Sequence, residues 1–114
     1  MKKFTLIAML VLLPMQTQAF FVTGNELVNE MHEDEKAYAK TGGSQFQSGR
    51  YIGFVAASYD VASELGKICP SSAVTLGQAM AIVTKYLKSN PEKWSDPAAD
   101  LVYLALTAAF PCKK

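Results

Sequence analysis

The sequence predicts an all-α protein: a small four-helix array closed by one disulfide and preceded by an N-terminal signal peptide. Apolar residues recur at three- and four-residue spacings in four segments, which is the period of an amphipathic helix. Signals for helix starts and stops separate these segments. No segment keeps the strict alternation that is typical of a β-strand. The chain has 114 residues, which is enough for one domain.

Residues 1–19 have the layout of a secretory signal peptide. Two lysines follow the initial methionine, an apolar run comes next, and small and polar residues end the segment at Ala19. A bilayer span needs about 20 apolar residues, so this run is too short to cross a membrane. An N-terminal membrane anchor is the alternative. Cleavage near Ala19 would leave one domain, residues 20–114, in the periplasm.

The charge balance argues against a nucleic-acid partner. The full chain has 11 Lys and Arg against 10 Asp and Glu, and loss of the two leader lysines leaves it slightly acidic. Binding to nucleic acid usually demands a clear basic excess. Lys113 and Lys114 are too few for a polybasic patch, so we also expect no membrane partner after the leader is removed.

The first helix is expected to begin at Thr23, because Thr23 and Glu26 have the spacing of a capping box. The helical period then assigns a buried stripe and a solvated face. The stripe is Leu27, Val28, Met31, Ala37 and Tyr38, and the solvated face is Glu30, Glu33, Asp34, Glu35 and Lys36. An acidic run of this kind is an interaction patch or, more often, simply a solvated surface.

Two adjacent glycines in the stretch 41–45 predict a loop. A second helix is expected from Ser48 or Gly49 to Leu65 or Gly66. The residues that share its buried face are Ile52, Val55, Ala56, Tyr59, Ala62 and Leu65.

Three further residues of this second helix carry expectations of their own. Tyr51 and Phe54 flank the buried face and are candidates for a dimer seam. Gly53 costs about 1 kcal/mol relative to alanine inside a helix, which indicates close approach of another helix or, alternatively, a kink.

The third helix is expected to begin after Thr75, which forms a second capping box with Gln78. Asn90 and Pro91 end it. Its buried stripe is Leu76, Ala79, Met80, Val83, Tyr86 and Leu87.

The last helix is expected to have Asp96 as its cap and Pro97 as its first residue. Pro111 ends it. Its core face is Leu101, Leu104, Ala105 and Ala108, widened by Val102, Leu106 and Phe110.

Cys69 and Cys112 are the two cysteines of the chain. In an exported protein such a pair usually forms a disulfide, because the compartment is oxidising; two free thiols are the alternative. The bond would join the end of the last helix to the turn before the third. Closing this long loop should stabilise the fold by about 4 kcal/mol in the chain-entropy model.

The residues do not point to catalysis, a metal or a cofactor. His32 is the single histidine, and it lies in the acidic first helix without a serine or cysteine at helical spacing. One histidine cannot form a zinc site alone. Gly42 and Gly43 lack the lysine and the strand of a phosphate-binding loop. We therefore expect a protein that is not an enzyme and that binds no cofactor.

The second half of the chain contains a series of short segments in a characteristic order and spacing. They read Gly49-Arg50-Tyr51-Ile52-Gly53, Cys69-Pro70, Val74 to Gln78, Val83 to Leu87, Asn90-Pro91-Glu92, Pro97-Ala98-Ala99, Leu101-Val102 and Ala109 to Cys112. This series, over residues 49–112, resembles the Rap/Tai family of type VI secretion immunity proteins. The family pattern often has a further cysteine just before the first segment. Here residues 44–48 contain none, so a second disulfide is absent.

The resemblance implies an exported helical domain, often a homodimer, with its two cysteines in a structural disulfide. It also implies a cognate secreted effector as partner, namely a peptidoglycan amidase whose active-site cleft the protein blocks. A general periplasmic binding protein, similar to the small acid-stress chaperones, is the alternative function.

Contacts to such a partner are expected outside the shared segments, in three loops. The candidates are Gln45 in the first loop, Ser71 and Ser72 in the turn after Cys69, and Glu92, Lys93 and Trp94 in the connector before the last helix. Exposed aromatic residues anchor interfaces. A lone Trp94 between helices, however, is more often part of a core.

Overall fold

The computed structural model describes residues 20–113, and the predicted leader, residues 1–19, lies outside them. The described part is helical, as predicted, with four α-helices and one short 3-10 helix. The helices are α1 (Gly24–Tyr38), α2 (Gln45–Glu64), α3 (Leu76–Ser89), η1 (Pro91–Lys93) and α4 (Ala98–Ala109). No helix within this part is both long and apolar enough to cross a membrane.

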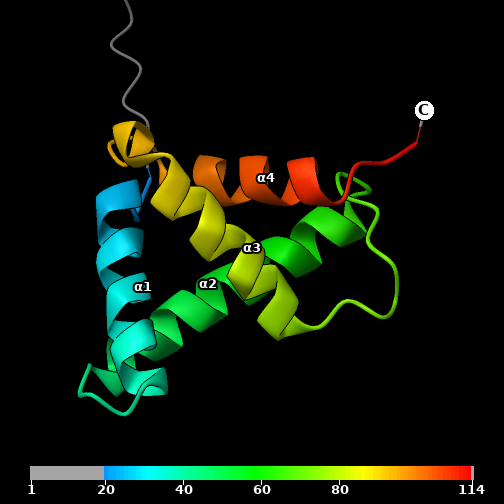
Figure 1. The fold of residues 1–114 in the computed structure, drawn as a ribbon. Helices are drawn as coiled ribbons and strands as arrows, with labels where there is room; N and C mark the ends of the chain where they lie inside the picture. Colours follow the sequence, from blue (N-terminus) through cyan, green and yellow to red (C-terminus); the bar gives the residue numbers. More distant parts are fainter. Residues whose placement is uncertain (1–19, 114) are drawn as a thin grey trace, which may run out of the picture.

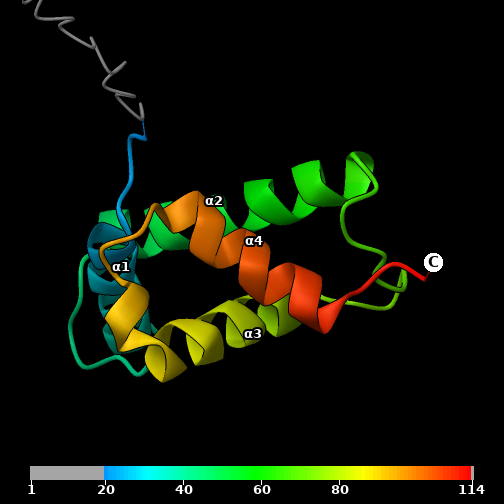
Figure 2. The ribbon, with the colours of Figure 1, turned by 90° about the horizontal axis from the view of Figure 1, so that it is seen from above.

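The three later α-helices form the body of the molecule, and α1 closes one end of it. Seen from above, α2 runs along one long side, α3 along the opposite side, and α4 crosses between them (Figure 2). In Figure 1, α1 stands across the end at which α2 begins and α3 ends. The loop between α2 and α3 therefore lies at the far end of the molecule from α1.

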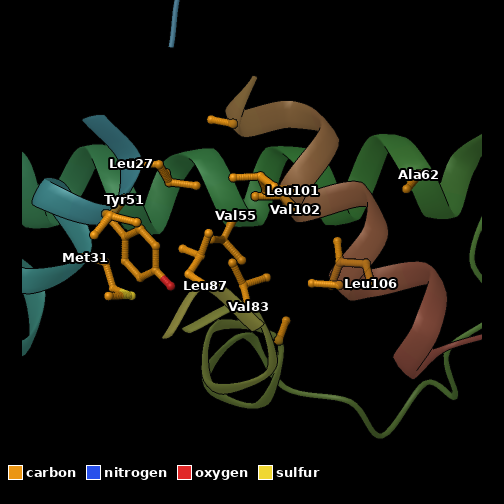
Figure 3. Close-up of a cluster of buried hydrophobic side chains, with 14 of the residues drawn as sticks. Leu27, Met31, Tyr51, Val55, Ala62, Val83, Leu87, Leu101, Val102 and Leu106 are labelled. Atoms are coloured by element: carbon orange, nitrogen blue, oxygen red, sulfur yellow. The ribbon is translucent and has the colours of Figure 1, made fainter. Parts of the chain in front are cut away.

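All four α-helices contribute side chains to one core (Figure 3). Its largest fully buried side chain is Tyr51, which α2 directs between α1 and α3. The other core residues are Leu27, Val28, Met31, Val55, Ala62, Ile68, Ala79, Val83, Leu87, Ala98, Leu101, Val102, Ala105 and Leu106. Because Tyr51 is fully buried, it cannot lie in a dimer seam, and that expectation is wrong.

The two capping boxes confirm the predicted starts of α1 and α3. The Thr23 hydroxyl accepts from the backbone N–H of Glu26 at 3.2 Å, and the Glu26 carboxylate accepts from that of Thr23 at 2.8 Å. Thr75 and Gln78 repeat the arrangement at the start of α3.

The start of α2 was predicted too late. The helix begins at Gln45 because Ser44 acts as its N-cap, with its hydroxyl accepting from the backbone N–H of Gln47. The loop after α1 is correspondingly shorter, and Gln45 lies in the first turn of the helix.

The buried face of α2 also differs from the prediction at its end. Leu65 is exposed, because the chain turns away at Gly66, whose φ of +66° favours glycine. Ile68 then returns to the core in its place, fully covered. A period of 3.6 residues cannot show where the helix stops, so it assigned Leu65 to the wrong side.

Similar corrections apply to single positions of the other helices. Glu30 of α1 is buried and Tyr38 is exposed, the reverse of what the periodicity suggested. Leu76, at the start of α3, is exposed, and so are Leu104 and Ala108 of α4, since α4 turns Leu101, Val102, Ala105 and Leu106 inward.

The start of α4 is stabilised by backbone hydrogen bonds to the residues around the start of α1. The predicted side-chain cap at Asp96 is wrong. The structure makes Pro97 the N-cap and Ala98 the first helical residue, with no side-chain hydrogen bond to the cap. The backbone N–H of Ala98 donates to the Val22 carbonyl at 3.1 Å, and that of Gly24 donates to the Asp96 carbonyl at 2.8 Å. These bonds tie Val22 and Gly24, on either side of the start of α1, to the segment that leads into α4.

The disulfide between Cys69 and Cys112 is present, as predicted. It joins the turn after α2 to the segment that follows α4. The backbone N–H of Cys69 also donates to the Phe110 carbonyl at 2.9 Å. The end of α4 is therefore fixed to this turn by a covalent bond and a hydrogen bond.

Candidate functional site

The acidic residues of α1 join helices together and are not merely solvated. The Glu33 carboxylate accepts from Lys36 Nζ at 2.8 Å and from the backbone N–H of Ser44 at 2.7 Å. These two hydrogen bonds lower the pKa of Glu33, the one from Lys36 most strongly. Glu33 thus fixes the residue that caps α2.

Gly43 brings the same loop close against α1. Its φ of +90° is one that residues with a side chain rarely adopt. A Cβ atom at this position would also lie only 2.6 Å from the Glu33 carbonyl oxygen and 2.9 Å from the Ala37 nitrogen. The loop between α1 and α2 is therefore closely packed at this point.

Two further pairs connect α1 to α2. Ser48 Oγ donates to the Asp34 carboxylate at 2.6 Å. Arg50 Nη1 lies 3.0 Å from a carboxylate oxygen of Glu30. Burial raises the pKa of Glu30, and the charge of Arg50 opposes that effect. Polar contacts of Ser48 and Arg50 therefore hold the junction between α1 and α2.

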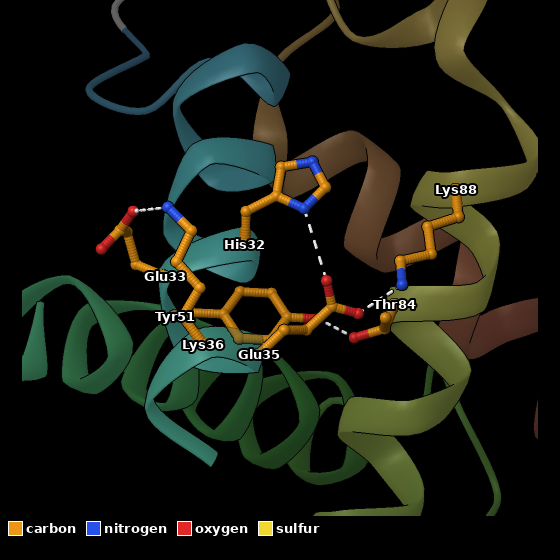
Figure 4. Close-up of polar contacts among 7 residues, drawn as sticks. All are labelled: His32, Glu33, Glu35, Lys36, Tyr51, Thr84 and Lys88. Atoms are coloured by element: carbon orange, nitrogen blue, oxygen red, sulfur yellow. Dashed lines mark hydrogen bonds and ion pairs between the residues drawn. The ribbon is translucent and has the colours of Figure 1, made fainter. Parts of the chain in front are cut away.

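A third group of charges connects α1 to α3 (Figure 4). Glu35 accepts a hydrogen bond from Lys88, and His32 Nδ1 lies 3.4 Å from the other oxygen of the same carboxylate. The hydrogen bond from Lys88 is the main reason that the pKa of Glu35 is lowered. The end of α3 is thereby held against α1.

Tyr51 supplies a polar contact beneath these charges. Its hydroxyl and the Thr84 Oγ1 lie 2.6 Å apart, between α2 and α3 (Figure 4). Burial is the largest effect on this phenol and raises the pKa of Tyr51 to about 12. The hydroxyl is therefore neutral at ordinary pH and serves as a structural hydrogen-bonding group.

The outer face of α1 forms a polar hollow of about 720 Å³. Its lining residues are Asn29, His32, Glu33, Glu35, Lys36, Thr41 and Gln47. These groups donate and accept hydrogen bonds, and their carboxylates are already engaged by lysines. Within residues 20–113, no three His, Cys, Asp or Glu side chains gather where they could hold a metal ion. The hollow suits polar contact with another molecule.

The six residues predicted to contact a partner fall in three separate places. Gln45 is exposed at the start of α2, and Ser71 and Ser72 are exposed in the loop between α2 and α3. These two sites lie at opposite ends of the molecule (Figures 1 and 2). No single flat surface is formed by all six, and their role stays a prediction.

The third place is the connector that carries Glu92, Lys93 and Trp94. Glu92 is exposed, while Lys93 and Trp94 are half-buried. Trp94 packs against the core, and its indole N–H donates to the Leu87 carbonyl at 2.8 Å. Lys93 Nζ lies 5.9 Å from the centre of the Tyr86 ring. Trp94 thus has a structural role in addition to the predicted contact.

An apolar groove between α2 and α4 was not predicted. It has a volume of about 490 Å³ and is lined by Phe54, Ala57, Ser58, Val61, Ala62, Leu65, Lys67, Ala99, Asp100 and Tyr103. Val61, Leu65 and Tyr103 are each substantially exposed. The sequence carried one signal of it: apolar residues at 57, 61 and 65 follow a four-residue spacing beside the buried face.

The comparison with protein families connects this domain to a known group. The sequence model of the Rap1a immunity proteins matches residues 23–112. The match begins at the cap of α1 and ends at the second cysteine, so it spans all four α-helices. No curated protein matches the chain.

Proposed function

Because the chain belongs to the Rap1a immunity protein family, we propose that it is the periplasmic antidote to a type VI secretion effector. We further propose that this effector is a peptidoglycan amidase. The family match over residues 23–112 carries the proposal. The protein acts by binding the effector and covering its active-site cleft, and it carries out no reaction of its own.

Contacts that restrain two of the loops support this mode of action. An inhibitor that is ordered before it binds loses little conformational freedom on binding. The loop between α1 and α2 is packed against Glu33, and the loop after α2 is joined at Cys69 to the segment after α4 by the disulfide. Gln45, Ser71 and Ser72 are thus presented from restrained segments, and we propose them, together with Glu92, Lys93 and Trp94, as effector contacts.

Export to the periplasm is a part of the proposal. A leader cleaved near Ala19 would release the chain just before the segment that pairs with α4, in which the Val22 carbonyl accepts from Ala98. The disulfide also requires an oxidising compartment to form and persist. A peptidoglycan amidase acts in that same compartment, where its antidote must meet it.

We also propose that the protein works as a homodimer. Two copies would offer an effector two sets of contacts from one assembly. The exposed apolar groove between α2 and α4 supports self-association, because an apolar surface of this kind marks an interaction site.

Inhibition of the effector encoded beside this gene tests the proposal. The measurement is release of cleaved stem peptides from purified peptidoglycan, with the protein titrated against the effector. We expect activity to fall to background at stoichiometric protein. An unrelated disulfide-bonded helical protein is the control. Full activity at a large excess of the protein, with no complex on a sizing column, would remove the proposal.

A further inference from the structure

The residues just before α1 are apolar and yet exposed. Phe20 is 46% exposed and Phe21 is 97% exposed. In Figure 2 this segment, drawn in blue, extends away from the body of the molecule. Val22, which follows it, is fixed, because its carbonyl accepts from the backbone N–H of Ala98 at 3.1 Å. The two phenylalanines are therefore attached beside the start of α4 while their rings lie largely in water.

An apolar hollow lies next to this attachment point. It has a volume of about 220 Å³ and is lined by Phe20, Phe21, Val22, Phe54 and Ala99. Phe54 and Ala99 also line the larger groove between α2 and α4, so the hollow and the groove are continuous there. A phenylalanine ring that turned onto this surface would leave water for contact with Phe54 and Ala99.

Gly53 leaves the neighbouring surface of α2 uncovered. A Cβ atom built at this position would meet nothing within 4 Å. The close packing that the sequence suggested for Gly53 is therefore absent from the described residues. No side chain at position 53 hinders access to Phe54, which is the next residue of the helix.

Asp100 supplies a negative charge at the same place. It lies in the first turn of α4, is exposed, and lines the groove together with Phe54 and Ala99. It is not among the ion pairs found within residues 20–113. The proposed cleavage after Ala19 would create an ammonium group at Phe20. Two residues of chain span about 7 Å at most, so this cation would stay close to the anchored Val22 and hence to the start of α4.

We infer that the Phe54 end of the groove between α2 and α4 is the docking site of the chain's own N-terminus, which closes onto it once the leader is removed. The rings of Phe20 and Phe21 then cover Phe54 and Ala99, and the ammonium group of Phe20 pairs with the Asp100 carboxylate. The rings supply most of the stabilisation, because burial of a phenylalanine outweighs an exposed ion pair. In the precursor, Phe20 is linked to Ala19 by a peptide bond and carries no ammonium group.

The chain's own N-terminus is favoured over an occupant from solution because it is tethered. Attachment at Val22 gives it a high effective concentration at the hollow. The occupied part is short: Val61 begins about 10 Å further along α2 than Phe54, beyond the reach of two residues, so Val61 and Leu65 stay exposed. The inference rests on the export named in the proposed function and not on the identity of the effector.

Thermal unfolding of the protein that cells export from the full gene tests the docking, after mass spectrometry has shown that it begins at Phe20. Phe21→Ser should lower the melting temperature by at least about 4 °C, a shift typical for loss of one buried contact in a domain of this size. Phe46→Ser changes a phenylalanine of α2 that is also exposed and is the matched control. It should leave the melting temperature unchanged. In NMR spectra of the wild type, we expect NOEs between the Phe21 ring and the Ala99 methyl group.

The ion pair has a test of its own. A short glycine-serine linker inserted between Ala19 and Phe20 moves the ammonium group away and leaves both phenylalanines in place. The insertion should lower the melting temperature of the wild type and have no further effect in Asp100→Asn. An equal effect in the two backgrounds would overturn the pairing with Asp100.

Effector inhibition by the same exported protein is a separate measurement. A docked N-terminus in a protein that inhibits no effector keeps the inference and removes the antidote role. A protein that begins at Phe20, shows no NOE to Ala99 and loses no stability in Phe21→Ser overturns the docking and leaves export intact. An exported chain that begins at another residue overturns it as well.

Discussion

Glu30 is buried between α1 and α2, and its carboxylate lies 3.0 Å from Arg50 Nη1. Removing the partner of a buried charge is costly, because the remaining charge is neither solvated nor paired. The half-exposed guanidinium reduces that cost here. Arg50→Met should therefore lower the free energy of unfolding by about 2 kcal/mol, as measured by urea denaturation at neutral pH.

The same variant should show a distinct pH dependence. Burial raises the pKa of Glu30 in the folded state above its ordinary value of 4.5. The destabilisation is then present at neutral pH and is relieved as pH falls through the raised pKa, because the carboxyl takes up a proton. Arg50→Met/Glu30→Gln is the control and should lack this pH dependence. If the loss of unfolding free energy in Arg50→Met stays constant down to pH 4.5, the buried charge of Glu30 is not its cause.

Acid should weaken the contacts made by three carboxylates of α1. The pKa values of Glu26, Glu33 and Glu35 are lowered from 4.5 in the folded state. Their contribution to stability is therefore complete above 4.5 and is lost as pH falls below it, through the lowered pKa of each group. Unfolding by urea from pH 7 to pH 2 measures this loss, and Glu33→Gln should reduce its slope.

This pH series also addresses the alternative function. An acid-stress chaperone should unfold or dissociate at low pH and then suppress the aggregation of other proteins. For an antidote, we expect loss of stability in acid without anti-aggregation activity. Protection of a model substrate against aggregation at pH 2–3 would favour the chaperone.

Removal of the disulfide should destabilise the protein strongly. Cys69→Ser frees the segment after α4 from the turn after α2. The loop that the bond closes predicts a loss of about 4 kcal/mol. Cys69→Ser/Cys112→Ser should lose about the same amount, because one bond is absent in both variants. Thiol titration of the denatured wild type should find no free thiol. Two reactive thiols would contradict the disulfide between Cys69 and Cys112.

Gly24 and Gly77 offer a matched pair of first-turn glycines. A Cβ at Gly24 would lie 2.5 Å from the Trp94 carbonyl oxygen, whereas one at Gly77 has its nearest neighbour at 3.9 Å. Gly24→Ala should push α1 away from the connector and lower the melting temperature. Gly77→Ala should leave it equal or raise it, since alanine favours the helix. Equal effects in thermal unfolding would contradict the close approach at Gly24.

Local signals predicted the four helices and the caps of α1 and α3, because each of these signals depends on a few neighbouring residues. Thr23 and Thr75 show this: their capping boxes involve residues three positions away and form as expected. The disulfide was also predictable, since only two cysteines exist in the chain.

The surfaces were harder to predict because they depend on residues distant in sequence. Glu30 is buried only because α2 brings Arg50 to it. Leu65 is exposed only because Ile68 takes the core position after the turn at Gly66. The groove beside Val61 forms only where α4 packs beside α2. Helical periodicity within one segment contains none of this information.

Protection of cells from the effector encoded beside this gene tests the antidote role most directly. The effector is directed to the periplasm and induced in cells that carry this gene with or without its first 19 residues. We predict that the full gene prevents lysis and that the gene without its leader does not. Lysis at the same rate in the presence of the full, exported protein would contradict the antidote role.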